Sequence, residues 1–424
     1  MVIINMLILF PIIVSPYNES KPEIERRNSG YIIVYEMEGN KIYGANLNLY
    51  GNLIDTFKIA EPLWNGDLKI PKIARVSNDT FFVVYQYEPH IPISDSVYYS
   101  ILGRNIFYVD SVSLGQEKIL YEGYWSYGEV FGYFNPVIKG GVSGFLLMVQ
   151  ADMIEPVAII SAKYSFRTPT GETINTYDEI KKGMYAADFC NSCFYMIDRG
   201  RYPPPSDTIV IFKFTQTGNI LDSNLLYNTD FWYTFPQMQV ENEYLAVVFP
   251  FSNLSIYFFH TIDTLKNIFN TNFSWTNSFK LLSNSSYFYL FVAKGDTLKG
   301  QRFFHNGVPK DSSPQTIYID DLPVQNIDGI WDGSRFFIVY EKNNDLYGLF
   351  VDSSFVEIKE NEGYEKYNRI NFKGFVLNKI YTPFFKKDIL IYSIMGYRFQ
   401  NKQVAPGVYI VIHKGEKSKI ILLR

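Results

Sequence analysis

The sequence predicts an all-β protein: a β-propeller of seven four-stranded blades, followed by a short C-terminal β-sandwich-like module. Three observations predict this fold. A short pattern returns seven times along the 424 residues. Its spacing is close to the 40–50 residues of a propeller blade. Its apolar stretches are continuous or alternate every second residue, whereas a helix would need apolar residues at i, i+3, i+4 and i+7.

Each copy of the pattern starts with a polar-flanked segment, often led by Pro, and continues through a polar turn into an aromatic and β-branched run. Residues 71–85, for example, read PKIARVSNDTFFVVY. The seven copies span residues 22–35, 71–85, 136–149, 187–198, 236–249, 279–292 and 325–340. The copies at 187–198 and 279–292 are weaker than the others. Two stacked β-sandwiches are the alternative, but seven sheet-sized units of similar period fit them poorly.

Within a copy, the two extended segments predict the inner and central strands of one blade. The turns between them carry Gly, Asn and Asp, which tolerate the positive φ of tight hairpins. A third and a fourth strand follow, as in residues 41–55, KIYGANLNLYGNLID. Gly51, Gly171 and Gly218 each sit between two such extended runs, where a hairpin turn is expected. Residues 22–370 therefore form the predicted propeller.

Composition narrows the classes of function. The 34 Tyr and 35 Phe suit half-buried strands, and we expect them to pack between blades rather than to form a glycan or peptide platform. The net charge of −4 is scattered, without the basic stripe that nucleic-acid binding needs. The four His lie far apart in the sequence. We therefore predict no nucleic-acid partner, no metal and no cofactor.

The two cysteines stand together as Cys190-Asn191-Ser192-Cys193, at the turn between two strands of the fourth copy. A redox CxxC site needs a helix N-terminus in a βαβ unit, and a zinc site needs a second pair of ligands. Neither is indicated here. The alternatives that remain are a disulfide clipping the hairpin, which requires an oxidising location, and two unpaired thiols.

The N-terminus reads MVIINMLILFPIIVSPYNES. Its apolar segment has signal-peptide length, and Ser15 is a small residue suited to a cleavage point, although no Lys or Arg precedes the segment. We expect residues 1–15 to be a signal peptide. The alternative is a buried N-terminal strand that helps close the ring. No other stretch reaches transmembrane length, so we expect no integral membrane segment after signal removal.

Residues 371–424 form the predicted C-terminal module. Its last part contains Ile391-Tyr392 followed by Gly396, then Gly407-Val408-Tyr409, then Gly415 and a strand from Lys419 to Arg424. In order, spacing and position these residues resemble the C-terminal sorting domain of the bacterial type IX secretion system. The usual domain is about twice as long. The resemblance implies export across the outer membrane, with Gly396, Gly407, Tyr409, Lys419 and Arg424 as sorting-domain positions and the export machinery as a partner.

No catalytic constellation emerges. The stretch Gly140–Gly144 is superficially like a GxSxG nucleophile elbow, but no helix follows it and a turn is the better interpretation. Arg199, Arg201 and Tyr202 precede a Pro run and form a candidate recognition loop, the alternative being a stiffened connection between strands. We name no catalytic residue.

These observations favour an exported binding module that recognises a protein or a glycan at or outside the cell surface. One alternative is a glycan-active hydrolase or lyase with a site at the propeller channel. Another is a structural envelope component. A cluster of three or more Arg, Asp or Glu at the channel mouth would favour the enzyme. A broad aromatic patch on one face would favour binding, and a featureless channel plugged by Phe and Tyr would favour a scaffold.

Overall fold

The computed structural model describes residues 10–13, 17–38, 40–62, 65–90, 99–108, 111–126, 129–153, 159–179, 185–199, 208–227, 236–250, 253–274, 278–356, 376–377, 389–393, 398–399, 407–413 and 416–423. The chain divides into two compact units, Met1–Lys359 and Glu360–Arg424. Among the described residues, no helix is long and apolar enough to span a membrane.

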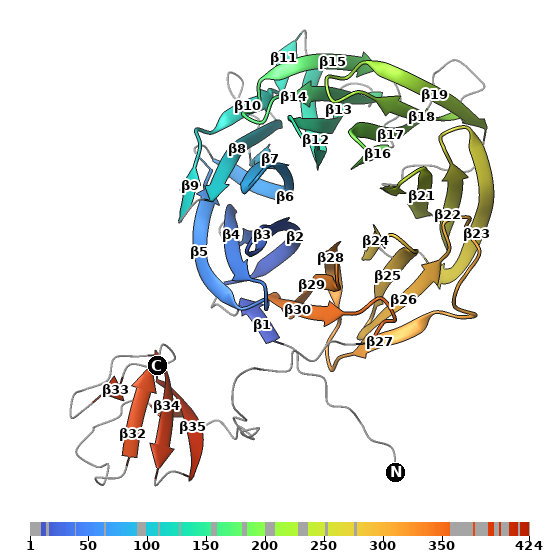
Figure 1. Ribbon diagram of the computed structural model, residues 1–424. Coiled ribbons are helices and arrows are strands. Elements are labelled where there is room, and N and C mark those ends of the chain that lie inside the picture. Colours follow the sequence, from blue (N-terminus) through green and yellow to red (C-terminus); the bar gives the residue numbers. More distant parts are fainter. Residues whose placement is uncertain are drawn as a thin grey trace. The chain divides into compact units, whose positions relative to one another are not determined.

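The first unit is a ring of seven antiparallel sheets around a central channel, as Figure 1 shows. This confirms the predicted fold class. Each sheet is a blade whose innermost strand borders the channel. Blades are numbered here by the order of their inner strands along the chain.

The strands of blades 1 to 3, from channel to rim, have the following bounds. Blade 1 consists of β2 (Glu19–Arg27), β3 (Gly30–Met37), β4 (Lys41–Asn48) and β5 (Leu53–Ala60). Blade 2 consists of β6 (Gly66–Ser77), β7 (Thr80–Pro89), β8 (Ser100–Tyr108) and β10 (Lys118–Tyr121), with β9 (Val112–Leu114) also paired to β8. Blade 3 consists of β12 (Glu129–Gly140), β13 (Phe145–Met153), β14 (Ile159–Arg167) and β15 (Thr173–Glu179), with β11 (Tyr124–Ser126) paired to β12.

The strands of blades 4 to 7 follow the same scheme. Blade 4 consists of β16 (Tyr185–Cys190), β17 (Cys193–Arg199), β18 (Thr208–Phe214) and β19 (Ile220–Tyr227). Blade 5 consists of β20 (Gln237–Glu241), β21 (Tyr244–Pro250), β22 (Asn253–His260) and β23 (Thr264–Ser274). Blade 6 consists of β24 (Phe279–Ser283), β25 (Phe288–Lys294), β26 (Thr297–Phe303) and β27 (Gln315–Ile319). Blade 7 consists of β28 (Gln325–Trp331), β29 (Phe336–Lys342), β30 (Asp345–Val351) and β1 (Phe10–Ile13).

The central strand of each blade is buried on both faces, which explains its continuous apolar run. In β3, Ile32 and Val34 pack against blade 2, whereas Tyr31 and Ile33 pack against blade 7. Aromatic rings fill the same interfaces between blades. Such packing accounts for the abundance of Phe and Tyr in the sequence.

In blades 1 to 3, the proline of the repeat lies at a bulge in the inner strand. Lys21, Ile70 and Asn135, each followed by Pro, have φ of 49°, 53° and 48°, and Asn326 at the equivalent place in β28 has 48°. The register shifts at each of these points. An inner strand is a sheet edge, so a proline there removes no ladder hydrogen bond that a neighbouring strand would need.

The ring is closed by the N-terminal segment. Strand β1 pairs antiparallel with β30 and becomes the outer strand of blade 7. Ile12 and Ile13 are buried there, with 3% and 6% of their surface exposed. The structure thus places part of the expected signal peptide in a blade, as in the alternative of a buried N-terminal strand; residues 1–9 and 14–16 lie outside the described residues.

The second unit, expected as a sandwich-like module, contains one five-stranded sheet in its described part, ordered β31-β35-β34-β32-β33. The strands are β31 (Val376–Leu377), β32 (Ile389–Ser393), β33 (Arg398–Phe399), β34 (Gly407–His413) and β35 (Glu416–Leu423). Gly407 and Tyr409 lie in β34, and Lys419 lies in β35. Gly396 and Arg424 are outside the described residues.

Candidate functional site

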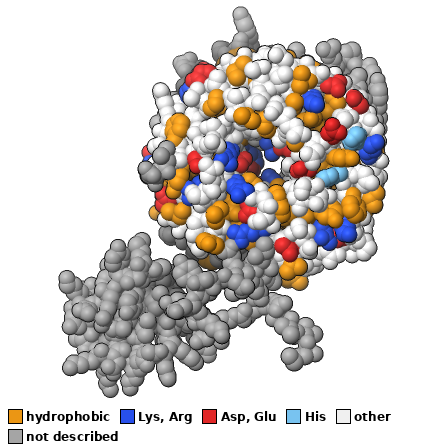
Figure 2. All heavy atoms as spheres, in the orientation of Figure 1, with side chains coloured by type: hydrophobic (Ala, Val, Ile, Leu, Met, Phe, Trp, Pro, Cys, Tyr) orange, Lys and Arg blue, Asp and Glu red, His pale blue; other side chains and the backbone are white. Residues whose placement is uncertain are grey.

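The candidate site is the central channel, a cavity of about 900 Å³ that the inner strands of all seven blades line. This volume lies within the range of pockets that bind small ligands. Figure 2 shows side chains of both charges around its opening. Its described lining carries the lysines Lys21, Lys72, Lys139 and Lys280 and the carboxylates Glu23, Glu25, Asp188, Glu241 and Asp328.

Strand register arranges the charged and amide side chains of the wall on two levels. One level contains Glu23, Lys72, Gln237, Lys280 and Asp328, each on the inner strand of a different blade. The next level lies two residues further along the strands and contains Glu25, Lys139, Asp188 and Gln239. Residues two apart on a strand point to the same face, so both levels face the channel.

Three ion pairs bridge neighbouring blades across this wall. Lys72 of blade 2 pairs with Glu23 of blade 1, and Lys280 of blade 6 pairs with Asp328 of blade 7. On the second level, Nζ of Lys139 lies 3.4 Å from a carboxylate oxygen of Asp188. Each pair joins two different sheets. These contacts therefore hold neighbouring blades together and also place charged groups on the channel surface.

The acidic groups also accept hydrogen bonds from the backbone of the next blade. The backbone N–H of Ile24 donates to Oδ2 of Asp328 at 2.8 Å, and that of Val240 donates to Oδ2 of Asp188 at 2.7 Å. Gln239 also donates to Asp188 through its side-chain amide, at 2.9 Å. Both aspartates are therefore fixed in place, as a preorganised binding wall requires.

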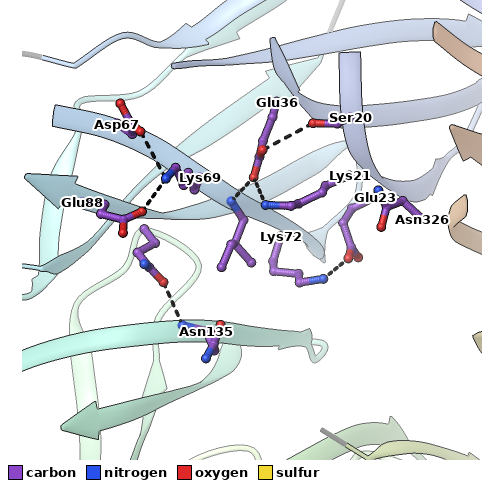
Figure 3. Close-up of polar contacts among 12 residues, drawn as sticks. Ser20, Lys21, Glu23, Glu36, Asp67, Lys69, Lys72, Glu88, Asn135 and Asn326 are labelled. Carbon is purple, nitrogen blue, oxygen red and sulfur yellow. Dashed lines mark hydrogen bonds and ion pairs between the residues drawn. The ribbon is translucent and has the colours of Figure 1, made fainter. Parts of the chain in front are cut away.

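A second polar network borders the channel at the bulges of blades 1 and 2. Figure 3 shows Glu36 between Ser20 and Lys21, and Lys72 pointing toward Glu23. Oε1 of Glu36 also accepts the backbone N–H of Ile70 at 2.6 Å, so a side chain of blade 1 holds the bulge of blade 2. The bulges are thereby locked in their left-handed conformation.

Glu25 is a carboxylate of the wall whose pKa is perturbed. Burial raises its pKa from the ordinary value of 4.5 to about 7, and the negative charge of Asp328 adds to this effect. The positive charges of Lys139 and Lys280 oppose it. Burial also raises the pKa of Glu23, against the attraction of Lys72. Near neutral pH, both the protonated and the ionised form of Glu25 are therefore populated.

We expect Glu25→Gln to stabilise the propeller at pH 8 and to have little effect near pH 4.5. The folded state binds the Glu25 proton more tightly than the unfolded state, so wild-type stability falls as pH rises from about 4.5 through 7. Each pKa unit corresponds to about 1.4 kcal/mol, and partial exposure of Glu25 reduces the effect, so we expect about 1–2 kcal/mol. Melting temperatures of wild type and Glu25→Gln between pH 4.5 and pH 8 test this expectation. The exposed Glu38→Gln is the control, and its melting temperature should follow that of wild type at each pH.

The two cysteines face each other across the hairpin of blade 4. Cys190 and Cys193 are register partners, and Asn191 and Ser192 between them both have positive φ, as a two-residue turn requires. The thiols are not joined in this structure. Burial raises the pKa of Cys190, whose thiol faces the carbonyl of Asn242 in blade 5. The disulfide stays a prediction.

The predicted recognition loop is only partly described. Arg199 ends β17, whereas Arg201 and Tyr202 lie outside the described residues, so the candidate recognition loop is not placed. Within the described part of the chain, no group of three or more His, Cys, Asp or Glu is arranged to hold a metal.

The channel wall itself was not predicted, although its ion-paired partners lie 48 or 49 residues apart, which is one blade period. A search for opposite charges at that spacing would have found it.

No protein-family model matches this chain, and no curated protein matches it. Solved structures resemble it at low identity. A Trypanosoma rangeli sialidase in complex with the inhibitor DANA shares 10% identity over 79% of this chain and 55% of that chain, with a TM-score of 0.47. This chain thus spans about half the length of that sialidase.

Two further structures show comparable likeness. The subtype N10 neuraminidase-like protein of A/little yellow-shouldered bat/Guatemala/060/2010 shares 9% identity over 68% of this chain and 94% of that chain, with a TM-score of 0.42. Saccharomyces cerevisiae Sqt1 shares 9% identity over 75% of this chain and 80% of that chain, with a TM-score of 0.43. At such identities the likeness concerns the fold alone.

Proposed function

We propose that this protein is a binding module that holds a short glycan in its central channel. The observation that supports this best is the wall itself, where ion-paired and amide side chains from different blades surround a cavity of about 900 Å³. Fixed carboxylates accept hydrogen bonds, lysines donate them, and Gln237 and Gln239 do both, which matches a polyhydroxylated ligand. A cavity of this size suits a small ligand better than a folded protein partner.

Binding to a panel of oligosaccharides, measured by isothermal titration calorimetry, tests this proposal. We expect at least one oligosaccharide to bind, and Lys139→Met to weaken its binding about tenfold or more, because a hydrogen bond to a charged group is lost. Lys58→Met is the matched control, since Lys58 is an exposed lysine on the outer strand β5. Equal affinities of the two variants would contradict a channel site.

A glycan-active hydrolase is the second candidate, and Glu25 favours it. A carboxyl with a pKa of about 7 is suited to donate a proton at neutral pH while a second carboxylate stays ionised. The described channel lining also carries five carboxylates, although Lys72, Lys139 and Lys280 neutralise three of them. Mass spectrometry of the oligosaccharides after incubation distinguishes the two functions, because a binding module returns its ligand intact.

We further propose export to the cell surface or beyond it. Support comes from the apolar N-terminus and from the residues that resemble a sorting domain, including Gly407, Tyr409 and Lys419. Cell fractionation, followed by mass spectrometry of both ends of the purified protein, tests export.

A further inference from the structure

The charges of the channel wall do not balance. Lys72, Lys139 and Lys280 each pair with one carboxylate of the wall, and Lys21 pairs with Glu36, which lies outside the cavity lining. Two lining carboxylates have no lysine or arginine partner among the described residues. These are Glu25 and Glu241.

The two remaining carboxylates differ in their surroundings. Glu241 is the last residue of β20, next to the hairpin turn, and its Oε2 accepts the hydroxyl of Ser283 at 3.1 Å. Glu25 lies on the level of Gln239, two residues further from the hairpin turn than Glu241. No described side chain donates a hydrogen bond to it. Among the described residues, Glu25 is therefore the lining carboxylate with neither a cationic partner nor a side-chain hydrogen-bond donor, and its ionised form can accept a cationic group of a ligand.

The charged groups that act on Glu25 come from several blades. Lys139 on β12 and Lys280 on β24 attract it, Asp328 on β28 repels it, and the adjacent peptide N–H of Arg26 donates to it. Both lysines are already committed to Asp188 and Asp328. A cation that enters the channel would meet at Glu25 a carboxylate that has no ion-pair partner of its own among the described side chains.

We propose that Glu25 binds the protonated amine of an amino sugar in the channel, so that the ligand is a glycan with a free, unacetylated amino group. This inference rests on the proposed function and adds the chemistry of its ligand. An ammonium group donates up to three hydrogen bonds and would neutralise the carboxylate, while the hydroxyl groups of the sugar would meet Lys139, Asp188 and Gln239 on the same level. An N-acetylated sugar carries no such charge.

The test compares a glucosamine tetramer with the tetramer of N-acetylglucosamine by isothermal titration calorimetry at pH 7. Wild type is expected to bind the glucosamine tetramer about tenfold tighter or more. Glu25→Gln is expected to lose this preference, to within about twofold, because the amide has no charge for the ammonium group. Glu25→Asp, which keeps the charge, should retain part of it, and Glu38→Gln should retain all of it.

The possible results distinguish the role of Glu25 from the presence of a glycan site in the channel. If wild type binds both tetramers equally well, or if Glu25→Gln keeps the preference, the role of Glu25 is overturned while the glycan site stands. If wild type binds neither tetramer but binds another neutral oligosaccharide, the amino-sugar ligand is overturned alone. If no oligosaccharide binds, both are overturned.

Discussion

Replacing both Ile12 and Ile13 by serine is expected to lower the melting temperature of the propeller by about 10 °C or more. Both side chains are buried in the interface between blades 7 and 1. Each buried isoleucine contributes about 1.5–3 kcal/mol, so the double substitution costs about 3–6 kcal/mol, and in a domain of this size each kcal/mol corresponds to about 2–4 °C. Differential scanning calorimetry measures the effect.

Strand β1 carries both buried and exposed side chains, so the effect of burial can be tested within one strand. Gly348 of β30 has no side chain, and a Cβ there would lie 2.9 Å from Cδ1 of Ile12, so β30 leaves room for that isoleucine. Pro11 on the same strand is exposed, and Pro11→Ser is the matched control that should change little. Equal melting temperatures of the two variants would mean that β1 is not part of blade 7 in the native protein.

The result also bears on export. A cleavage near Ser15 would remove β1, and the last blade of the mature protein would then have three strands. A destabilised double variant of the full chain, together with a mature N-terminus that still contains Ile12, would mean that the apolar segment is a structural strand. A mature chain that starts after Ser15 would support the signal peptide instead.

The propeller could be predicted from the sequence because each blade repeats the same local chemistry. The central strands are buried on both faces, so their apolar runs stand out, and the turns need Gly, Asn or Asp at positive φ. Gly51 and Gly171 have φ of 77° and 94° at the predicted hairpins. Such signals depend only on residues near one another in the chain.

The strand that closes the ring could not be predicted in this way. Residues 10–13 pair with residues more than 330 positions away, and a short apolar segment looks the same in a signal peptide and in an outer strand. The channel wall could not be predicted for a similar reason. Glu23 and Lys72 are ordinary charged residues in their own strands, and they meet only because blades 1 and 2 are neighbours in the ring.

Gly140→Ala is expected to destabilise the propeller by about 3 kcal/mol or more, although it adds a single methyl group. Gly140 ends β12, where it lies against the backbone of the inner strand of blade 2. A Cβ at this position would lie 1.8 Å from the backbone oxygen of Arg75. Neither backbone can yield as a flexible side chain would, so the two blades must separate, and overpacking of a rigid site costs at least as much as the 1–3 kcal/mol usual in cores.

Gly295→Ala provides the control for this substitution. Gly295 has a φ of 61°, but no atom lies within 4 Å of the position of a Cβ, so alanine there meets only the left-handed strain of about 1 kcal/mol. Urea unfolding of the two variants measures the difference. If Gly140→Ala is no worse than Gly295→Ala, blades 2 and 3 are not in contact at Arg75, and the close approach of their inner strands there is wrong. If it is clearly worse, the inner strands of blades 2 and 3 are in backbone contact at Arg75, as the structure has them.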